Sequence, residues 1–139
     1  MEQFSALCSE KLSAKTAKVP VSGPWHSHYL TDARLAFDVW AADLSYQRPK
    51  IPLILNANAQ TEYHPDTIKH LNGWQLQSPV FWADIMSRMR NMGVDIFVEI
   101  GPGKLLSGLL RANGFSRSVK SFAINQISAI GDMVRKQVS

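Results

Sequence analysis

The stretch Asp95–Lys104, DIFVEIGPGK, decides the fold class of this 139-residue chain. Its first part, Asp95–Ile100, is rich in β-branched and aromatic residues, which is typical of a strand buried on both faces of a parallel sheet. The glycines of GPGK then turn the chain into a helix predicted over Leu105–Ala112. A strand that runs through a tight turn directly into a helix favours an α/β fold.

The rest of the chain repeats this alternation of strands and helices. Ile51–Leu55 is predicted to be a second strand buried on both faces, because it is continuously apolar and β-rich. Weaker strand signals cover Lys18–Ser22, which Gly23 and Pro24 end, and Val119–Ile124. Strands that alternate with helices throughout predict an α/β domain with a mainly parallel sheet.

Helices are predicted where apolar residues recur every three or four positions. Thr31 or Asp32 is expected to cap the helix predicted from Leu30. Ser78 and Pro79 are expected to cap and open the helix predicted to end at Met92. The predicted helices, besides the one after GPGK, span Gln3–Ala14, Leu30–Leu44, Pro65–Leu76, Ser78–Met92 and Ile127–Val138.

Composition and charge narrow the class of protein. Apolar residues make up 45% of the chain and charged residues 19%, which is enough to bury the core of one domain. Cys8 is the single cysteine, so no internal disulfide forms and a reducing cytoplasm is the simplest compartment. No apolar run reaches the roughly 20 residues that span a bilayer, and the first residues do not resemble a secretory signal. The net charge of +4 favours acidic partners. However, the basic residues are scattered, so we expect neither nucleic-acid nor membrane binding.

Two histidines, His26 and His28, stand one residue apart in VSGPWHSHYL. They could bind a metal together with His64 and His70, but these residues fall on different elements and no zinc motif is present, so no metal site is expected. His26 follows Gly-Pro at a turn, where a histidine can act as a general base or simply lie in solvent. The residues alone leave both readings of His26 open.

One nucleotide-binding motif and one nucleophile motif are absent from the sequence. GPGKLLSGLL, residues 101–110, has one residue between its glycines where a phosphate-binding P-loop needs four, so a tight strand-to-helix turn is the simpler interpretation. The N-terminus of the following helix could still meet an anion. No GxSxG occurs, so the chain lacks the serine turn of α/β hydrolases.

Four segments in combination resemble a known family. VSGPWHS (21–27), IPLILNANA (51–59), WQLQSPVFW (74–82) and FVEIGPGKLLSGLL (97–110) occur in the order and spacing of the C-terminal part of the malonyl-CoA:acyl carrier protein transacylase family. That family includes the acyltransferase domains of fatty acid and polyketide synthases. The resemblance implies that residues 23–139 form the C-terminal portion of a hydrolase-like α/β core. It also implies that residues 1–22 end a small ferredoxin-like subdomain.

The resemblance further implies a reaction and its residues. A serine takes a malonyl or related acyl group from coenzyme A and passes it to the phosphopantetheine thiol of acyl carrier protein, without a further cofactor. His26 matches the histidine that activates the serine. Gln75 lies in the block whose backbone carbonyl orients that histidine, and Asn56 matches a pocket-supporting asparagine. Trp25 matches a position that helps set the size of the acyl unit, where a bulky residue favours malonyl. All three are predicted to belong to the substrate site.

The nucleophile is expected to lie outside this chain. In the family the serine motif, the oxyanion donors and the arginine that pairs with malonate precede the position of Met1. We therefore expect the chain to be inactive alone and to pair with a complementary half or with itself, because its strands would lack cover. The alternative is a non-catalytic remnant that binds carrier protein or oligomerises.

Overall fold

The computed structural model describes residues 2–14, 16–17, 20–116 and 119–138. Within them the chain is a mixture of helices and short strands, which confirms the α/β class. The elements are α1 (Glu2–Leu12), the 3-10 helix η1 (His28–Leu30), α2 (Thr31–Ala41), β1 (Leu53–Ile54), β2 (Thr61–Glu62), α3 (Pro65–Trp74), α4 (Trp82–Asn91), β3 (Ile96–Ile100), α5 (Leu105–Leu109), β4 (Lys120–Ile124) and α6 (Ser128–Val138).

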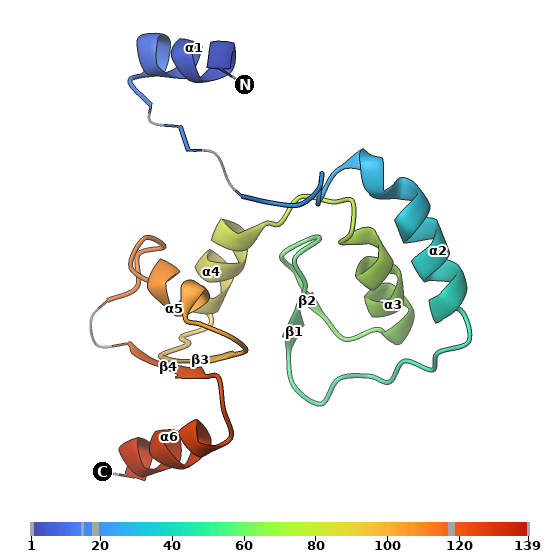
Figure 1. Ribbon diagram of the computed structural model, residues 1–139. Helices are drawn as coiled ribbons and strands as arrows, with labels where there is room; N and C mark the ends of the chain where they lie inside the picture. The colour runs from blue at the N-terminus through green and yellow to red at the C-terminus, as the bar shows by residue number, and fades with distance from the viewer. Residues whose placement is uncertain (1, 15, 18–19, 117–118, 139) are drawn as a thin grey trace.

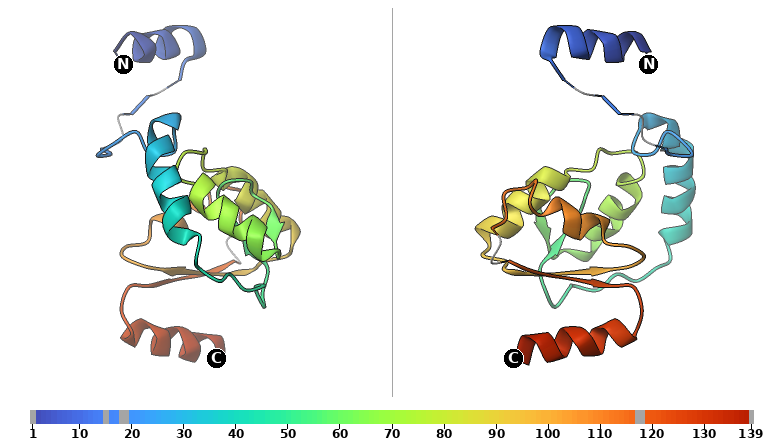
Figure 2. Two further views of the ribbon diagram at one scale, coloured as in Figure 1. Left: turned by 90° about the vertical axis from the view of Figure 1, so that its right-hand side faces the viewer. Right: turned by 60° about the vertical axis from the view of Figure 1, so that its left-hand side comes forward.

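Two groups of elements lie side by side in Figure 1. The first, here called the histidine lobe, is residues 23–78 and contains α2, α3 and the β1–β2 pair. The second, here called the sheet lobe, is the described part of residues 82–138 and contains α4, β3, α5, β4 and α6. Both views of Figure 2 show α1 apart from the two lobes and α6 beyond the β3–β4 sheet.

The sheet lobe is built on a parallel pair of strands. β3 pairs with β4 in register from Ile96 opposite Lys120 to Ile100 opposite Ile124, so the prediction of parallel strands is confirmed. On one side the buried residues Met86, Leu110 and Phe115 form an apolar core. Phe97 of β3 meets Phe115 edge to face, with ring centroids 4.8 Å apart. This aromatic contact joins the sheet to the loop that follows α5.

The other face of β3 is open, which corrects the prediction of a strand buried on both faces. Ile96 and Val98 are each 41% exposed and Ile100 is 82% exposed. Apolar side chains of this kind alternate with the half-buried residues Phe97 and Glu99. The strand has the composition of a doubly covered one because three of its five residues are β-branched. Within the described residues, however, helices cover only one of its faces well.

The prediction for Ile51–Leu55 was wrong in extent and in pairing. Only Leu53 and Ile54 form a strand, β1, and it pairs antiparallel with β2. Ile51 is 74% exposed, and Pro52 has no N–H to donate to a ladder. After Leu55 the chain turns at once, since the N–H of Ala59 donates to the carbonyl of Leu55 at 3.0 Å. The apolar run is therefore too short and too interrupted to form a full strand here.

The start of α4 also differs from the prediction, because Ser78 and Pro79 do not open it. The helix begins at Trp82. The N–H of Ser78 donates to the carbonyl of Trp74 and closes the turn after α3, while the N–H of Phe81 donates to the carbonyl of Asn56. Those two bonds tie the segment between α3 and α4 to other parts of the chain before the helix can start.

Smaller differences concern element ends. Pro20–Ser22 is not a strand, and Lys18 and Val19 of that prediction lie outside the described residues. α2 is capped by Leu30 and stops at Ala41, and α5 stops at Leu109, earlier than predicted. α1 and α6 lie close to the predicted ranges. Across the described residues, every helix is too short or too polar to cross a membrane.

Candidate active site

His26 lies in a tight turn between Gly23 and η1, and its backbone has an uncommon conformation. Its φ is +60°, in the left-handed region that few non-glycine residues adopt. The backbone N–H of His26 donates to the carbonyl of Leu76 at 3.1 Å. The hydroxyl of Ser27 donates to the carbonyl of Pro24 at 2.5 Å, which closes the turn locally. The turn is therefore fixed both by itself and by the segment after α3.

The imidazole of His26 is oriented by a second backbone carbonyl. Its Nδ1 lies 2.9 Å from the carbonyl oxygen of Gln75, which is 49 residues further along the chain. A carbonyl oxygen only accepts hydrogen bonds, so Nδ1 must carry the hydrogen. In the neutral ring, Nε2 then presents a lone pair that can take a proton. The residue is exposed, so this nitrogen is accessible from outside the chain.

The two carbonyls that hold His26 come from the turn that ends α3. That helix starts with Pro65 in its first turn, where a missing N–H costs nothing, and Gln75 is its C-terminal cap. The N–H of Gln75 donates to Leu71 at 2.9 Å and the N–H of Leu76 to Gly73 at 3.2 Å. These bonds satisfy the amides of the turn and leave its last carbonyls to face His26.

The other two candidate residues lie farther from this contact. Trp25 precedes His26, and its side chain is 53% exposed with the indole near Gly23. Asn56 is half-buried, and its backbone oxygen accepts the N–H of Phe81 at 3.1 Å. The structure thus brings His26 and Gln75 together, while Asn56 contacts the segment that follows Gln75. The roles of all four residues remain predictions.

Sequence reasoning missed the carbonyl of Leu76. A backbone group leaves no signal in a pattern of side chains, so nothing in the sequence distinguishes Leu76 from Gln75. Only the family resemblance places the GPWHS turn and the WQLQSP turn in one site. In the structure, two consecutive backbone carbonyls of the WQLQSP turn accept hydrogen bonds from His26. The carbonyl of Gln75 accepts from ring Nδ1, and that of Leu76 accepts from the backbone N–H.

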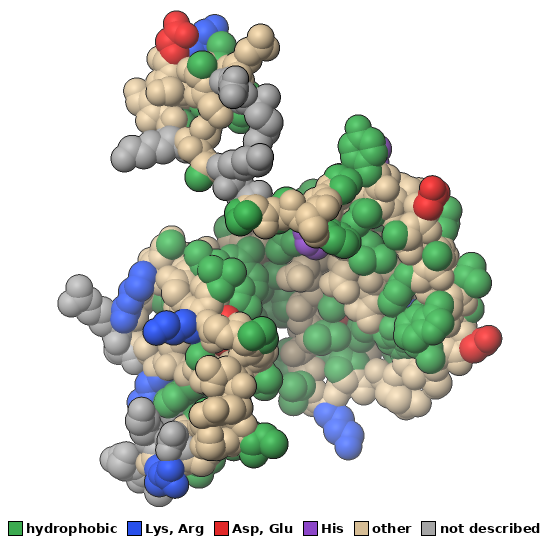
Figure 3. Space-filling view, in the orientation of Figure 1, with side chains coloured by type: hydrophobic (Ala, Val, Ile, Leu, Met, Phe, Trp, Pro, Cys, Tyr) green, Lys and Arg blue, Asp and Glu red, His purple; other side chains and the backbone are tan. Residues whose placement is uncertain are grey.

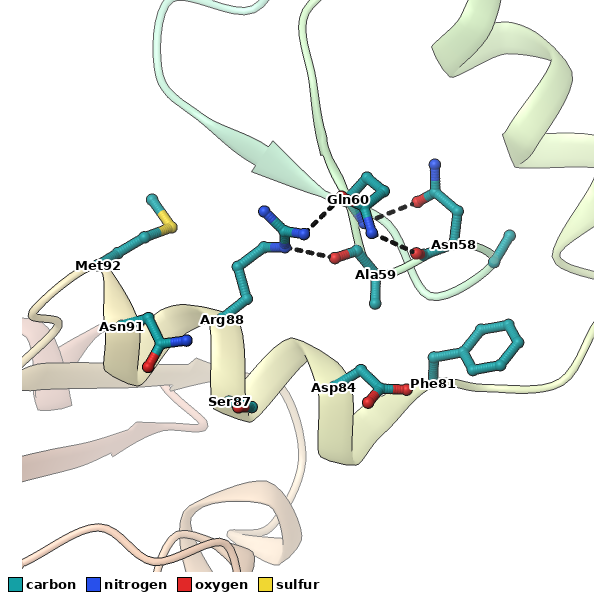
Figure 4. Close-up of a pocket in the computed structure, with 10 residues that line it drawn as sticks. Asn58, Ala59, Gln60, Phe81, Asp84, Ser87, Arg88, Asn91 and Met92 are labelled. Atoms are coloured by element: carbon teal, nitrogen blue, oxygen red, sulfur yellow. Dashed lines mark hydrogen bonds between the residues drawn. The ribbon is translucent and has the colours of Figure 1, made fainter.

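A polar pocket of about 730 Å³ lies between the loop after β1 and α4. Figure 4 shows the Arg88 side chain extending from α4 toward Ala59 and Gln60. Its Nε donates to the carbonyl of Ala59 at 2.6 Å, and its terminal nitrogen donates to Oε1 of Gln60 at 2.5 Å. The pocket lining includes Asn58 and Asp84 but not His26. Arg88 thereby joins the sheet lobe to the loop that carries Asn56.

The first residues of α5, just after the GPGK turn, bind the carboxylate of Glu99 from β3. The carboxylate of Glu99 accepts the backbone N–H groups of Leu106 at 3.0 Å and Ser107 at 2.8 Å, and also the Ser107 hydroxyl at 2.8 Å. The bond from the Ser107 N–H is the main reason that the pKa of Glu99 lies below its ordinary value of 4.5. Gly101 and Gly103, with φ of +145° and +89°, make this tight turn possible. The backbone N–H groups of Leu106 and Ser107, at the N-terminus of α5, therefore already donate to a side chain of the protein itself.

The four histidines lie at different places in the described structure. Among the described residues, no group of three His, Cys, Asp or Glu side chains is arranged to hold a metal ion. His70 instead stacks on Trp74, with ring centroids 6.1 Å apart, and His28 lies against Tyr29.

Comparison with known proteins shows which proteins the chain is similar to. No protein-family model matches the chain. A solved acyl carrier protein S-malonyltransferase from Vibrio cholerae superposes with a TM-score of 0.82 and 32% identity, over 95% of this chain and 42% of that one. The malonyl CoA-acyl carrier protein transacylase of Staphylococcus aureus is 36% identical over 110 residues, which is 79% of this chain and 35% of the relative. The Escherichia coli enzyme of that name is 28% identical over 94% of this chain and 41% of the relative.

The fold and the His26–Gln75 contact therefore occur in a chain that is similar to acyltransferases. More particularly, the resemblance to the malonyl-CoA:acyl carrier protein transacylase family is confirmed by sequence and by structure. The chain spans about two fifths or less of the length of the curated relatives it matches.

Proposed function

We propose that this chain supplies the histidine of an acyl-transfer site that moves a malonyl or related acyl group from coenzyme A to acyl carrier protein. The observation that carries the proposal is the 2.9 Å contact between Nδ1 of His26 and the carbonyl of Gln75. It leaves Nε2 as the proton acceptor, which is what a general base beside a serine requires. The names of the similar proteins supply the substrates and the carrier protein.

The chemistry proceeds in two steps. In the first, Nε2 of His26 takes the proton of a serine hydroxyl while the oxygen attacks the thioester carbonyl of the acyl-CoA; the coenzyme A thiolate leaves and recovers that proton. In the second, the same nitrogen takes the proton of the carrier's phosphopantetheine thiol, whose sulfur attacks the acyl-serine ester. The serine oxygen leaves and is reprotonated by His26.

We expect the serine to come from outside these residues, since no GxSxG motif occurs in the sequence. We therefore expect the chain to act only with the remaining part of the acyltransferase fold. In this proposal Trp25 forms a wall of the substrate site that favours small acyl groups. Asn56 supports the loop beside that site. The division at residue 22 between a small subdomain and the large core belongs to the same proposal.

The experiment is intact-protein mass spectrometry after incubation with malonyl-CoA. The chain is measured alone and together with the complementary part of a malonyl transacylase, with carrier protein added in a second step. We expect a malonyl adduct only in the presence of the complement. Replacing His26 by Ala should slow adduct formation at least about a hundredfold, as loss of a general base does.

The matched control is His28→Ala, because this exposed histidine lies two residues away and should leave the rate unchanged. An adduct on the chain alone would show that the nucleophile lies within these 139 residues. Equal rates for the native chain and His26→Ala would remove His26 from the mechanism.

The distribution of charge favours a second candidate function, the binding of an acidic carrier protein without chemistry. Residues 82–139 carry eight Lys and Arg against four Asp and Glu, whereas residues 1–81 carry seven of each. The whole net charge of +4 thus comes from the sheet lobe and its ends. In Figure 3 basic side chains gather over that lobe. Carrier binding that weakens with salt and survives His26→Ala, with no adduct under any condition, would favour this second function.

A further inference from the structure

Gly73, in the last turn of α3, lies against side chains of α2. It is buried, and a Cβ atom at this position would overlap Oδ1 of Asp38 on α2. The same atom would lie 3.1 Å from Cγ of Asp38 and 3.5 Å from the ring of Phe37. Only a hydrogen fits between the backbone of α3 and the side chain of α2 at this point.

The Asp38 carboxylate is also engaged through its other oxygen. Oδ2 of Asp38 lies 2.8 Å from NH1 of Arg34, one turn earlier on α2. The Arg34 guanidinium in turn faces the ring of Trp74, with its central carbon 5.6 Å from the ring centroid. A planar guanidinium that pairs and stacks at once has little freedom to follow a displaced carboxylate. A larger residue at position 73 would therefore open the ion pair or push α3 away from α2.

This contact lies shortly before the two carbonyls that hold His26. The carbonyl of Gly73 accepts the N–H of Leu76, so the position of Gly73 sets that of the Gln75–Leu76 turn. His26 itself precedes η1 and α2, which carries Asp38. The two partners of the Nδ1 hydrogen bond are thus attached to two helices that meet at Gly73. A small separation of these helices changes the distance between the imidazole and its carbonyl.

We propose that Gly73 and Asp38 are positioning residues for His26: their close contact fixes the distance between α2 and α3 at which the Gln75 carbonyl holds Nδ1–H. This inference rests on the proposed function for its relevance to acyl transfer. The geometric part concerns this chain alone. It can be tested without substrate, because the tautomer of His26 reports directly on the hydrogen bond.

The first test is nitrogen-15 NMR of the His26 ring in the full chain and in Gly73→Ala. In the native chain we expect Nδ1 to be the protonated nitrogen of the neutral ring. In Gly73→Ala we expect the Nδ1–H form to lose at least about half of its population. Gly108→Ala is the matched control, since a Cβ atom added to that helical glycine would have nothing within 4 Å. It should leave the His26 signals unchanged.

The second test is rescue. In Gly73→Ala combined with Asp38→Ala, the added methyl group no longer meets a carboxylate, so the native Nδ1–H population should return. If Gly73→Ala does not fold, Asp38→Glu replaces it, because a longer acid in the same space must also separate the helices. Unchanged His26 signals in the folded Gly73→Ala or Asp38→Glu variant would overturn the proposal. An altered signal that the double variant does not restore would overturn it as well.

Acyl transfer with the complementary part gives the kinetic readout. A shift of the base of about 1 Å can cost on the order of a hundredfold in rate, so Gly73→Ala should lower kcat at least about tenfold with KM nearly unchanged. If Gly73→Ala leaves the His26 NMR signals unchanged while transfer still depends on His26, the positioning role alone is rejected. A clear NMR effect with no transfer in any sample would reject the proposed function alone.

Discussion

Both lobes bury apolar side chains, such as Ile68 and Leu71 in the histidine lobe and Met86 and Leu110 in the sheet lobe, but they differ in their other contacts. In the histidine lobe, segments far apart in sequence are joined by single polar contacts, such as His26 to Gln75 and Asn72 to the Tyr46 hydroxyl at 3.0 Å. In the sheet lobe, a regular parallel ladder packs one face against an apolar core and leaves the apolar residues of β3 exposed on the other. The arrangement around the histidine is therefore closed within this chain, whereas the hydrophobic cover of the sheet is not.

This difference separates two requirements of an active site. The orientation of a base depends on a few hydrogen bonds of defined geometry, and these can be satisfied within a short chain. The burial of a sheet depends on area, which requires another layer of structure on the open face. A chain that spans two fifths of its relatives can meet the first requirement without meeting the second.

The largest effect is expected from breaking the core of the sheet lobe. Met86 is the most deeply buried large side chain among the described residues, at 1% exposure. Met86→Ala should lower the free energy of unfolding by about 2–5 kcal/mol, because it removes buried methylene groups and leaves a cavity. Urea unfolding followed by circular dichroism measures it. Met92→Ala, at an exposed position, should cost less than about 0.5 kcal/mol. Equal effects of the two variants would mean that this core contributes little.

The next effect tests the open face itself. We expect the native chain to associate at micromolar concentration through the exposed residues of β3, and Ile100→Lys to lower the apparent mass measured by sedimentation, since a charge there must be desolvated on association. Tyr29→Lys places the same charge on a comparably exposed residue of the histidine lobe and should have no such effect. A native chain that sediments as a monomer would contradict this prediction, as would a stronger effect of Tyr29→Lys.

A smaller effect is expected at the joint between the lobes. Arg88 donates from α4 to the carbonyl of Ala59 and to Gln60. Lysine lacks the planar pair of donors, so Arg88→Lys should lower the free energy of unfolding by about 1 kcal/mol. It should also speed hydrogen exchange at Ala59, whose N–H closes the loop. Arg90→Lys, which affects a bond within the sheet lobe, is the control and should leave Ala59 unchanged.

The smallest effect concerns pH and the turn before α5. Because the pKa of Glu99 is lowered in the folded chain, its contribution is present above the ordinary value of 4.5 and is lost as the pH falls through the lower folded value. Protection of the Ser107 amide from hydrogen exchange, corrected for intrinsic rates, should therefore decrease below pH 4.5. Glu99→Gln should show weaker protection with no such dependence. Asp95→Asn, just before the other end of β3, should behave like the native chain.

Sequence patterns predicted the presence of the helices and of the strands β3 and β4, because such segments carry their own signal. They failed for Ile51–Leu55, where composition indicated a buried strand but Pro52 and the turn after Leu55 left only two residues in β1. They also failed for the start of α4, since the bond from Phe81 to Asn56 joins residues that no local pattern connects. Contacts between distant backbone groups are invisible to periodicity.

The candidate site shows the same limit. His26 and Gln75 are selected by the family resemblance, and no spacing rule places a residue 49 positions away against an imidazole. Gly73 does carry a local signal, because a glycine inside a helix costs about 1 kcal/mol relative to alanine and suggests a packing reason. The sequence cannot name Asp38 as that reason, because the contact depends on how two helices cross.

The left-handed backbone of His26 has a consequence for how the chain tolerates change. A φ of +60° costs a residue with a side chain about 1 kcal/mol or more, whereas glycine adopts it freely. Replacing His26 by Gly would relieve that cost while removing one exposed hydrogen bond of similar size. Folding stability would then change little although the imidazole is gone. A change to glycine at this position can therefore remove the imidazole without a detectable loss of expression or solubility.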